Sequence, residues 1–68
     1  MATYTIHIRE HVPETWFEGF RLDHLPDHST CLTGPLRDQA ALHGLLMRIR
    51  DLNLTLVSVE LVETEEQL

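Results

Sequence analysis

The chain has 68 residues, a length that allows one domain at most. Its composition, 43% hydrophobic and 24% charged residues, is typical of a folded globular protein. The formal net charge is −6, from 11 acidic residues against 5 arginines and no lysine. This balance excludes a basic nucleic-acid-binding surface and argues against binding to an anionic membrane.

Small size sets the next constraint, because a chain this short buries only about 60% of its unfolded surface. The single cysteine, Cys31, excludes an intrachain disulfide. Stability must therefore come from a metal, from self-association or from a small but sufficient core. The N-terminal stretch MATYTIHIRE lacks the basic and apolar regions of a signal peptide, and no apolar run reaches the roughly 18 residues of a membrane span. We therefore expect a cytoplasmic protein.

Alternating apolar and polar residues predict a half-buried first strand over residues 3–9. Pro13 ends this segment, and residues 14–19 fit a short helical turn with Pro13 at its first position. A second strand over residues 20–24 and a third over residues 29–33 follow. The sequence Leu-Pro-Asp-His between them is typical of a turn, so the two strands are predicted to be antiparallel.

The dipeptide Gly34-Pro35 is expected to end the third strand. An amphipathic helix follows Asp38, which suits the N-cap position. Its apolar residues recur at the helical period: Leu42, Leu45, Leu46, Ile49 and Leu52. Gly44 costs about 1 kcal/mol relative to alanine within a helix, so we expect a close contact there. Asn53 fits the left-handed residue that closes a helix.

The last strand is predicted over residues 54–62, followed by a frayed acidic tail over residues 63–68. Strict alternation places Val57, Val59 and Leu61 on one face of this strand. Leu54 and Leu56 then lie on the other face, so both faces are apolar near its start. A sheet covered by one helix does not normally have such a strand.

The predicted fold class is therefore α+β, with the element order β-β-β-α-β in one domain over residues 1–62. One antiparallel or mixed sheet of four strands carries the helix on one face. We expect the strand order 4-1-2-3, with the fourth strand parallel to the first. The second face of the sheet has no cover in a monomer.

One long segment resembles a known group of proteins. The sequence TGPLRDQAALHGLLMRIRDLNLTLVSV is similar to the phrase TGPxxDQAALHGLLxxIRDLxLxLxSV found in a family of short prokaryotic proteins. A Trp-Phe pair before a glycine, here Trp16, Phe17 and Gly19, also matches. Asn53 stands where that family has glycine. The resemblance supports the strand-helix-strand prediction and implies no activity, cofactor or catalytic residue.

The five histidines and Cys31 are the candidate metal ligands. His24 and His28 flank a turn, and Cys31 supplies the one thiol, so these three residues are the weak candidates for a metal site. No CxxC or HExxH spacing occurs. The sequence therefore predicts no metal, no cofactor and no catalytic residue, and it does not point to an enzyme.

The leading hypothesis is a small interaction or structural protein that forms a homodimer. The interface candidates are Leu54, Leu56, Trp16 and His7. Two copies could stack their uncovered faces or pair their fourth strands edge to edge. The alternative is a ligand- or metal-binding module, possibly catalytic, with a site between protomers that is lined by His7, His43, Trp16 or Arg9. No nucleic acid, membrane or other partner is predicted.

Overall fold

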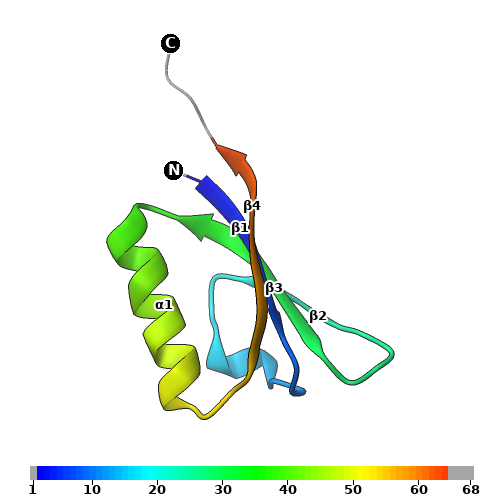
Figure 1. Cartoon of the computed structure of the whole chain (residues 1–68). Coiled ribbons are helices and arrows are strands. Elements are labelled where there is room, and N and C mark those ends of the chain that lie inside the picture. Colours follow the sequence, from blue (N-terminus) through cyan, green and yellow to red (C-terminus); the bar gives the residue numbers. More distant parts are fainter. Residues whose placement is uncertain (1, 65–68) are drawn as a thin grey trace.

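A computed structural model describes residues 2–64 of the chain (Figure 1). Its elements are β1 (Ala2–Ile8), the 3-10 turn η1 (Glu14–Trp16), β2 (Arg21–His24), β3 (Thr30–Leu36), α1 (Gln39–Asp51) and β4 (Leu56–Thr64). The four strands form one sheet, and α1 lies on one side of it (Figure 1). The predicted α+β class is confirmed. Within residues 2–64, no helix has the length and apolar character needed to cross a membrane.

The strand order is β2-β3-β1-β4, and every neighbouring pair is antiparallel. As predicted, β4 lies at an edge beside β1. The inner order differs from the prediction, because β3 rather than β2 is the second neighbour of β1. The direction of β4 also differs: β3 runs antiparallel to β1, and α1 returns the chain in the direction of β3. Consequently β4 is antiparallel to β1.

Burial explains why β2 is at the edge. In β1 and β3 the fully buried side chains Ile6, Ile8 and Leu32 line one face, so both strands belong in the middle of the sheet. In contrast, β2 has four residues, and Leu22 alone is half-buried. A short, mostly exposed strand suits a sheet edge.

The connection from β1 to β2 covers the sheet together with α1. Its residues Val12 and Phe17 are buried in the same cluster as Leu45 and Ile49 of α1. Arg48 links the two covering segments, since its Nη2 donates to the Trp16 carbonyl oxygen over 2.8 Å and its guanidinium lies 5.4 Å from the Phe17 ring centroid. The chain between β1 and β2 is therefore part of the core and not a hairpin turn.

The helix ends follow the sequence signals. The Asp38 carboxylate accepts a hydrogen bond from the Ala41 backbone N–H over 2.8 Å, and Asn53 has φ 62°, as predicted for the two caps. Two details of the helix prediction are wrong. Leu52 is 37% exposed and lies outside the buried core. A Cβ on Gly44 would meet nothing within 4 Å, so no close contact explains this glycine.

The prediction that Gly34-Pro35 ends the third strand is also wrong, because β3 continues to Leu36. The last pair between β2 and β3 is Arg21 with Thr33, so β3 pairs on one side only beyond Thr33. Pro35 tolerates this position because its missing N–H is not needed there. Gly34 is required for a different reason: a Cβ at this position would lie 2.6 Å from Cδ2 of Phe20.

Two register shifts against β1 decide which side chains of β4 face the helix. They occur beside Val57 and Val62, so Leu56 is opposite Ile8 and Val59 is opposite Ile6. Each extra residue resets the alternation of the strand. Leu56 therefore lies on the helix side with Val59. The predicted separation of these residues was wrong because strict alternation ignores the bulge.

Leu54 precedes β4 and packs against the core cluster, so it also lies on the helix side and not on the opposite face as predicted. The predicted acidic tail begins too early, since Glu63 and Thr64 belong to β4. The rest of that tail, residues 65–68, lies outside the described residues.

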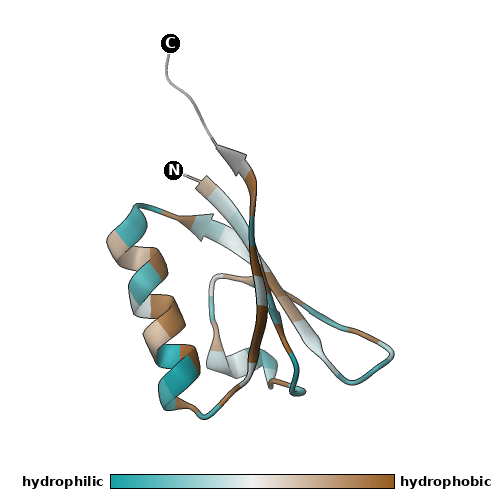
Figure 2. Ribbon diagram, in the orientation of Figure 1, coloured by the Kyte–Doolittle hydropathy of each residue, from teal (hydrophilic) through white to brown (hydrophobic). Residues whose placement is uncertain are grey.

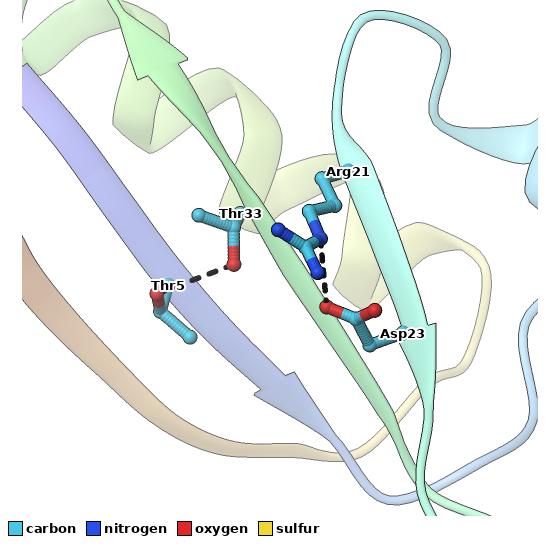
Figure 3. A network of polar contacts seen from close by, with 4 residues as sticks. All are labelled: Thr5, Arg21, Asp23 and Thr33. Carbon is cyan, nitrogen blue, oxygen red and sulfur yellow. Dashed lines mark hydrogen bonds and ion pairs between the residues drawn. The ribbon is translucent and has the colours of Figure 1, made fainter.

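The face turned away from α1 is polar. By register with the buried residues of β1, it carries Thr5, His7, Arg21, Asp23, Cys31, Thr33, Ser58 and Glu60. Thr5 Oγ1 lies 3.3 Å from Thr33 Oγ1, and Arg21 Nε lies 3.4 Å from Asp23 Oδ2 (Figure 3). An antiparallel sheet can expose such a face to water. This face therefore does not need the cover that the sequence suggested.

Candidate functional site

Exposed apolar side chains gather along β4. Leu56, Val57, Leu61 and Val62 are 44–57% exposed, and Figure 2 shows the apolar stretches of this strand in brown. The strand has nine residues and ends the strand order, so its outer edge pairs with no other strand among residues 2–64. An exposed, apolar edge of this length is a site for pairing with another strand.

An apolar groove of about 370 Å³ adjoins this edge. It is lined by Leu46, Met47, Ile49, Arg50, Leu54 and Leu56, and so lies between the second half of α1 and the start of β4. Met47 is 53% exposed. The groove and the helix-side residues of β4 form a continuous apolar surface that begins at Leu56, the residue common to both.

A second candidate site lies on the polar face of the sheet. A pocket of about 300 Å³ is lined by His7, Arg9, Asp27, Ser29 and Val57. His7 Nε2 lies 2.9 Å from Ser29 Oγ, and Ser29 Oγ donates to Asp27 Oδ1 over 2.5 Å. The turn residues Asp27 and Ser29 are held together, since the Ser29 backbone N–H also donates to Asp27 Oδ1 over 3.0 Å.

The order of this hydrogen-bond chain decides its chemistry. The Ser29 hydroxyl has one proton, which goes to Asp27, so its oxygen must accept from the Nε2–H of His7. In a catalytic triad the histidine lies between the acid and the serine and takes the serine proton. Here the serine lies in the middle and is 3% exposed. The arrangement fixes a turn and does not activate a nucleophile.

The pKa of the Asp27 carboxyl lies below its ordinary value. The largest cause is the hydrogen bond from the Ser29 hydroxyl, and the second is the hydrogen bond from the Ser29 backbone N–H. Asp27 therefore carries its charge at neutral pH. With Arg9 at the same pocket, the site offers one fixed anion and one fixed cation to a small polar ligand.

Cys31 is opposite His7 in the register of β3 and β1, but it is not a reactive thiol. Burial, followed by the negative charges of Asp23, Asp27 and Glu60, raises the pKa of the Cys31 thiol above its ordinary value. A nucleophilic cysteine needs the opposite shift. Cys31 is thus a small, half-buried strand residue.

The three weak metal candidates do not come together. His24 Nε2 lies 2.8 Å from the Val12 carbonyl oxygen, and its ring stacks on His11 with the centroids 3.9 Å apart. Cys31 and His24 belong to different residue pairs of the β2–β3 ladder, on opposite faces of the sheet. No group of three or more His, Cys, Asp or Glu residues within the described range has a geometry that could hold a metal ion.

The four interface candidates are distributed over three places. Leu54 and Leu56 line the apolar groove, whereas His7 is part of the polar chain with Ser29. Trp16 is 39% exposed on η1. The interface candidates predicted from the sequence did not include Leu61 or Met47, although the apolar residues of the last strand extend to Val62.

The fold and both surfaces can now be compared with known proteins. No curated protein and no solved structure matches this chain. The model of one family, described as a domain of unknown function (DUF8691), matches residues 3–60. The matched range begins in β1 and ends within β4, and so includes the helix and most of the sheet. The chain therefore belongs to the DUF8691 family, whose function is unknown.

Proposed function

We propose that this domain acts through self-association, as a homodimer that forms along the free edge of β4. The observation that carries the proposal is the combination of an edge strand of nine residues with four apolar side chains that are 44–57% exposed. Backbone N–H and C=O groups along such an edge gain partners when a second strand is added. The apolar side chains lose contact with water at the same time.

The exposed apolar side chains of β4 set an upper bound on the hydrophobic free energy of pairing. Full burial of a leucine or valine side chain contributes about 1.5–3 kcal/mol. Because Leu56, Val57, Leu61 and Val62 are about half exposed, their complete burial in both copies would contribute on the order of 6–12 kcal/mol. This is an upper bound, since a strand added at the edge covers only part of each side chain. The bound is comparable to the roughly 4–15 kcal/mol that association costs in lost translational and rotational freedom. The added backbone hydrogen bonds favour the dimer further.

The polarity of the sheet face argues for edge pairing over face stacking. Stacking would bury Asp23 and Glu60 together with the Arg21 guanidinium, and buried charges are costly unless they are paired. Pairing along β4 leaves these groups in water. It also leaves the helix-side groove at Leu56 next to the new strand.

Multi-angle light scattering at micromolar concentration tests the proposal. The expected mass is twice the 7.9 kDa of one chain. The Leu61→Lys variant should be a folded monomer, because it places a charge in the interface without touching the buried core. The matched control is Trp16→Lys, which alters an exposed apolar residue outside β4 and should remain dimeric. A monomeric wild-type protein would overturn the proposal.

A second candidate function is binding of a small polar ligand in the pocket of about 300 Å³ that contains Arg9 and Asp27. Arg9 is exposed, and its guanidinium suits a carboxylate or phosphate group. A thermal-shift series with inorganic phosphate and small carboxylates tests this function. The Arg9→Gln variant should abolish any ligand-induced increase in melting temperature. If no ligand shifts the wild-type protein, this candidate is rejected.

A further inference from the structure

We infer that the β4 strands of two copies pair antiparallel, with the twofold axis of the dimer passing between the two Val59 residues. This inference rests on the proposed self-association and adds the direction and register of the interface. The observation that carries it is the sequence of residues 56–62, LVSVELV. Its pattern of apolar and polar residues is the same when read from either end, and Val59 is the central residue.

Antiparallel pairing about Val59 places each apolar residue opposite an apolar residue and each polar residue opposite a polar residue. The opposed pairs are Leu56 with Val62, Val57 with Leu61, Ser58 with Glu60, and Val59 with Val59 of the second copy. The side-chain faces agree at the centre of the strand. Val59 lies on the helix side opposite Ile6, whereas Ser58 and Glu60 both lie on the polar face. A surface that is complementary to itself in this way is the requirement of a twofold interface.

Neighbouring registers fit less well. A slip of one residue puts Val59 opposite Ser58 and joins side chains from opposite faces of the sheet. An axis at Glu60 places two glutamates directly opposite each other, and like charges in such a pair are destabilising. An axis at Ser58 moves Leu61 opposite Thr55, which lies outside β4. The axis at Val59 avoids the like-charge pair, keeps Leu61 opposite a residue of β4 and joins side chains of the same face in its central pairs. The faces differ at the bulge, where Val57 of the polar-face pocket is opposite Leu61.

Charge supports the antiparallel direction. A parallel pair in register would place the Glu60 residues of both copies side by side, and like charges in such a pair are destabilising.

The groove offers a second point of agreement. Val62 of the second copy lies opposite Leu56, which forms one wall of the groove beside α1. The apolar end of the added strand therefore lies next to the apolar surface at Leu56. In this arrangement the two sheets form one continuous sheet of eight strands, twice the four of one copy.

Disulfide trapping distinguishes the registers. In a Cys31→Ala background, single cysteines replace Ser58, Val59 or Glu60, and each protein is oxidised mildly and analysed on a non-reducing gel. Non-hydrogen-bonded pairs alternate along an antiparallel ladder and bring side chains closest. In the inferred register, the Val59–Val59 pair and the Ser58–Glu60 pair are adjacent, so one of them is non-hydrogen-bonded. Crosslinked dimer should therefore predominate in at least one of two samples: the Val59→Cys protein, or an equal mixture of Ser58→Cys and Glu60→Cys. An Asp23→Cys protein, altered on the opposite edge strand β2, is the matched control and should stay uncrosslinked.

Ser58→Cys alone and Glu60→Cys alone should not crosslink. Two copies of either residue are about 8 Å apart in the inferred register, given the spacing of strands and residues. This exceeds the reach of a disulfide. Predominant crosslinking of either single variant would overturn the axis at Val59, as would failure of both expected samples in a protein that is dimeric by light scattering. A monomer by light scattering would instead overturn the proposed function itself.

Discussion

Both carboxylate oxygens of Glu10 accept hydrogen bonds from Thr55, one from its backbone N–H and one from its hydroxyl, each over 2.7 Å. The carbonyl oxygen of Thr55 accepts the N–H of Arg9 over 3.0 Å. These contacts join the end of β1 to the residue that immediately precedes β4. They fix where the chain enters β4 after the left-handed turn at Asn53. The register shift at Val57, and with it the apolar edge, starts from this fixed point.

Replacement of Glu10 by glutamine should lower the melting temperature at pH 7, because an amide has one acceptor oxygen where the carboxylate has two. The hydrogen bonds from Thr55 hold the pKa of the Glu10 carboxyl below its ordinary value of 4.5. A lowered folded-state pKa stabilises the protein above the unfolded value, and this stabilisation is lost as the pH falls through the folded value. The difference in melting temperature between wild type and Glu10→Gln should therefore shrink below about pH 4.5.

Thermal unfolding followed by circular dichroism from pH 3 to pH 7 measures this effect. Glu18→Gln is the matched control, since Glu18 is an exposed carboxylate in the β1–β2 connection. Its melting temperature should follow that of the wild type at every pH. A Glu10→Gln difference that is constant over the whole range would contradict the role of the ionised carboxylate.

Replacement of Thr30 by valine should destabilise the fold. The fully buried Thr30 hydroxyl donates to the Glu10 carbonyl oxygen over 2.8 Å and accepts the Val12 N–H over 3.0 Å. Valine removes both hydrogen bonds and leaves two backbone groups without partners, at a cost of about 1–3 kcal/mol. Thr30→Ser keeps the hydroxyl and should lose less. Urea unfolding measures both variants, and a valine variant as stable as the serine variant would show that the hydroxyl is unimportant.

Gly34→Ala should also be destabilising, for a steric reason. The new Cβ would lie 2.6 Å from Cδ2 of Phe20, so the ring must move out of its place over β3. Overpacking of this kind costs about 1–3 kcal/mol. Removing the ring in Phe20→Ala should make the alanine at position 34 nearly neutral. A double-mutant cycle by urea unfolding tests this, and additive effects of the two changes would exclude the contact as the cause.

Cys31 should react slowly with thiol reagents in the folded protein at pH 8. Burial and the nearby carboxylates raise the pKa of this thiol above its ordinary value of 9.0, so little thiolate is present. Unfolding in guanidinium should increase the rate, because it removes both causes. Asp23→Asn should increase the rate in the folded protein, since Asp23 is the first of the charged neighbours that raise the pKa. Equal rates in the folded and unfolded protein would contradict this account.

Local sequence signals were sufficient for most of the elements. The alternation in β1, the Asp38 N-cap and the Asn53 turn depend on interactions within a few residues, and each appears in the structure as predicted. The candidate site was predicted less well. Leu54 and Leu56 were selected as interface residues for their apolar character, but the face assigned to them was wrong because a bulge cannot be read from composition.

The sequence by itself determined the α+β class, the caps of α1 and a last strand, predicted over residues 54–62, that is rich in apolar residues. Propensity, capping and periodicity act over short distances, and so they can be read from the sequence. Only the tertiary structure decided that β3 lies beside β1, since this pairing depends on Val12 and Phe17 folding into the core from the connection between β1 and β2. It also decided which faces are apolar. The bulge at Val57 gathers the leucines of β4 on the helix side and leaves the other face of the sheet polar. The free edge of β4, and not the open face, is therefore the surface that an interacting strand would cover.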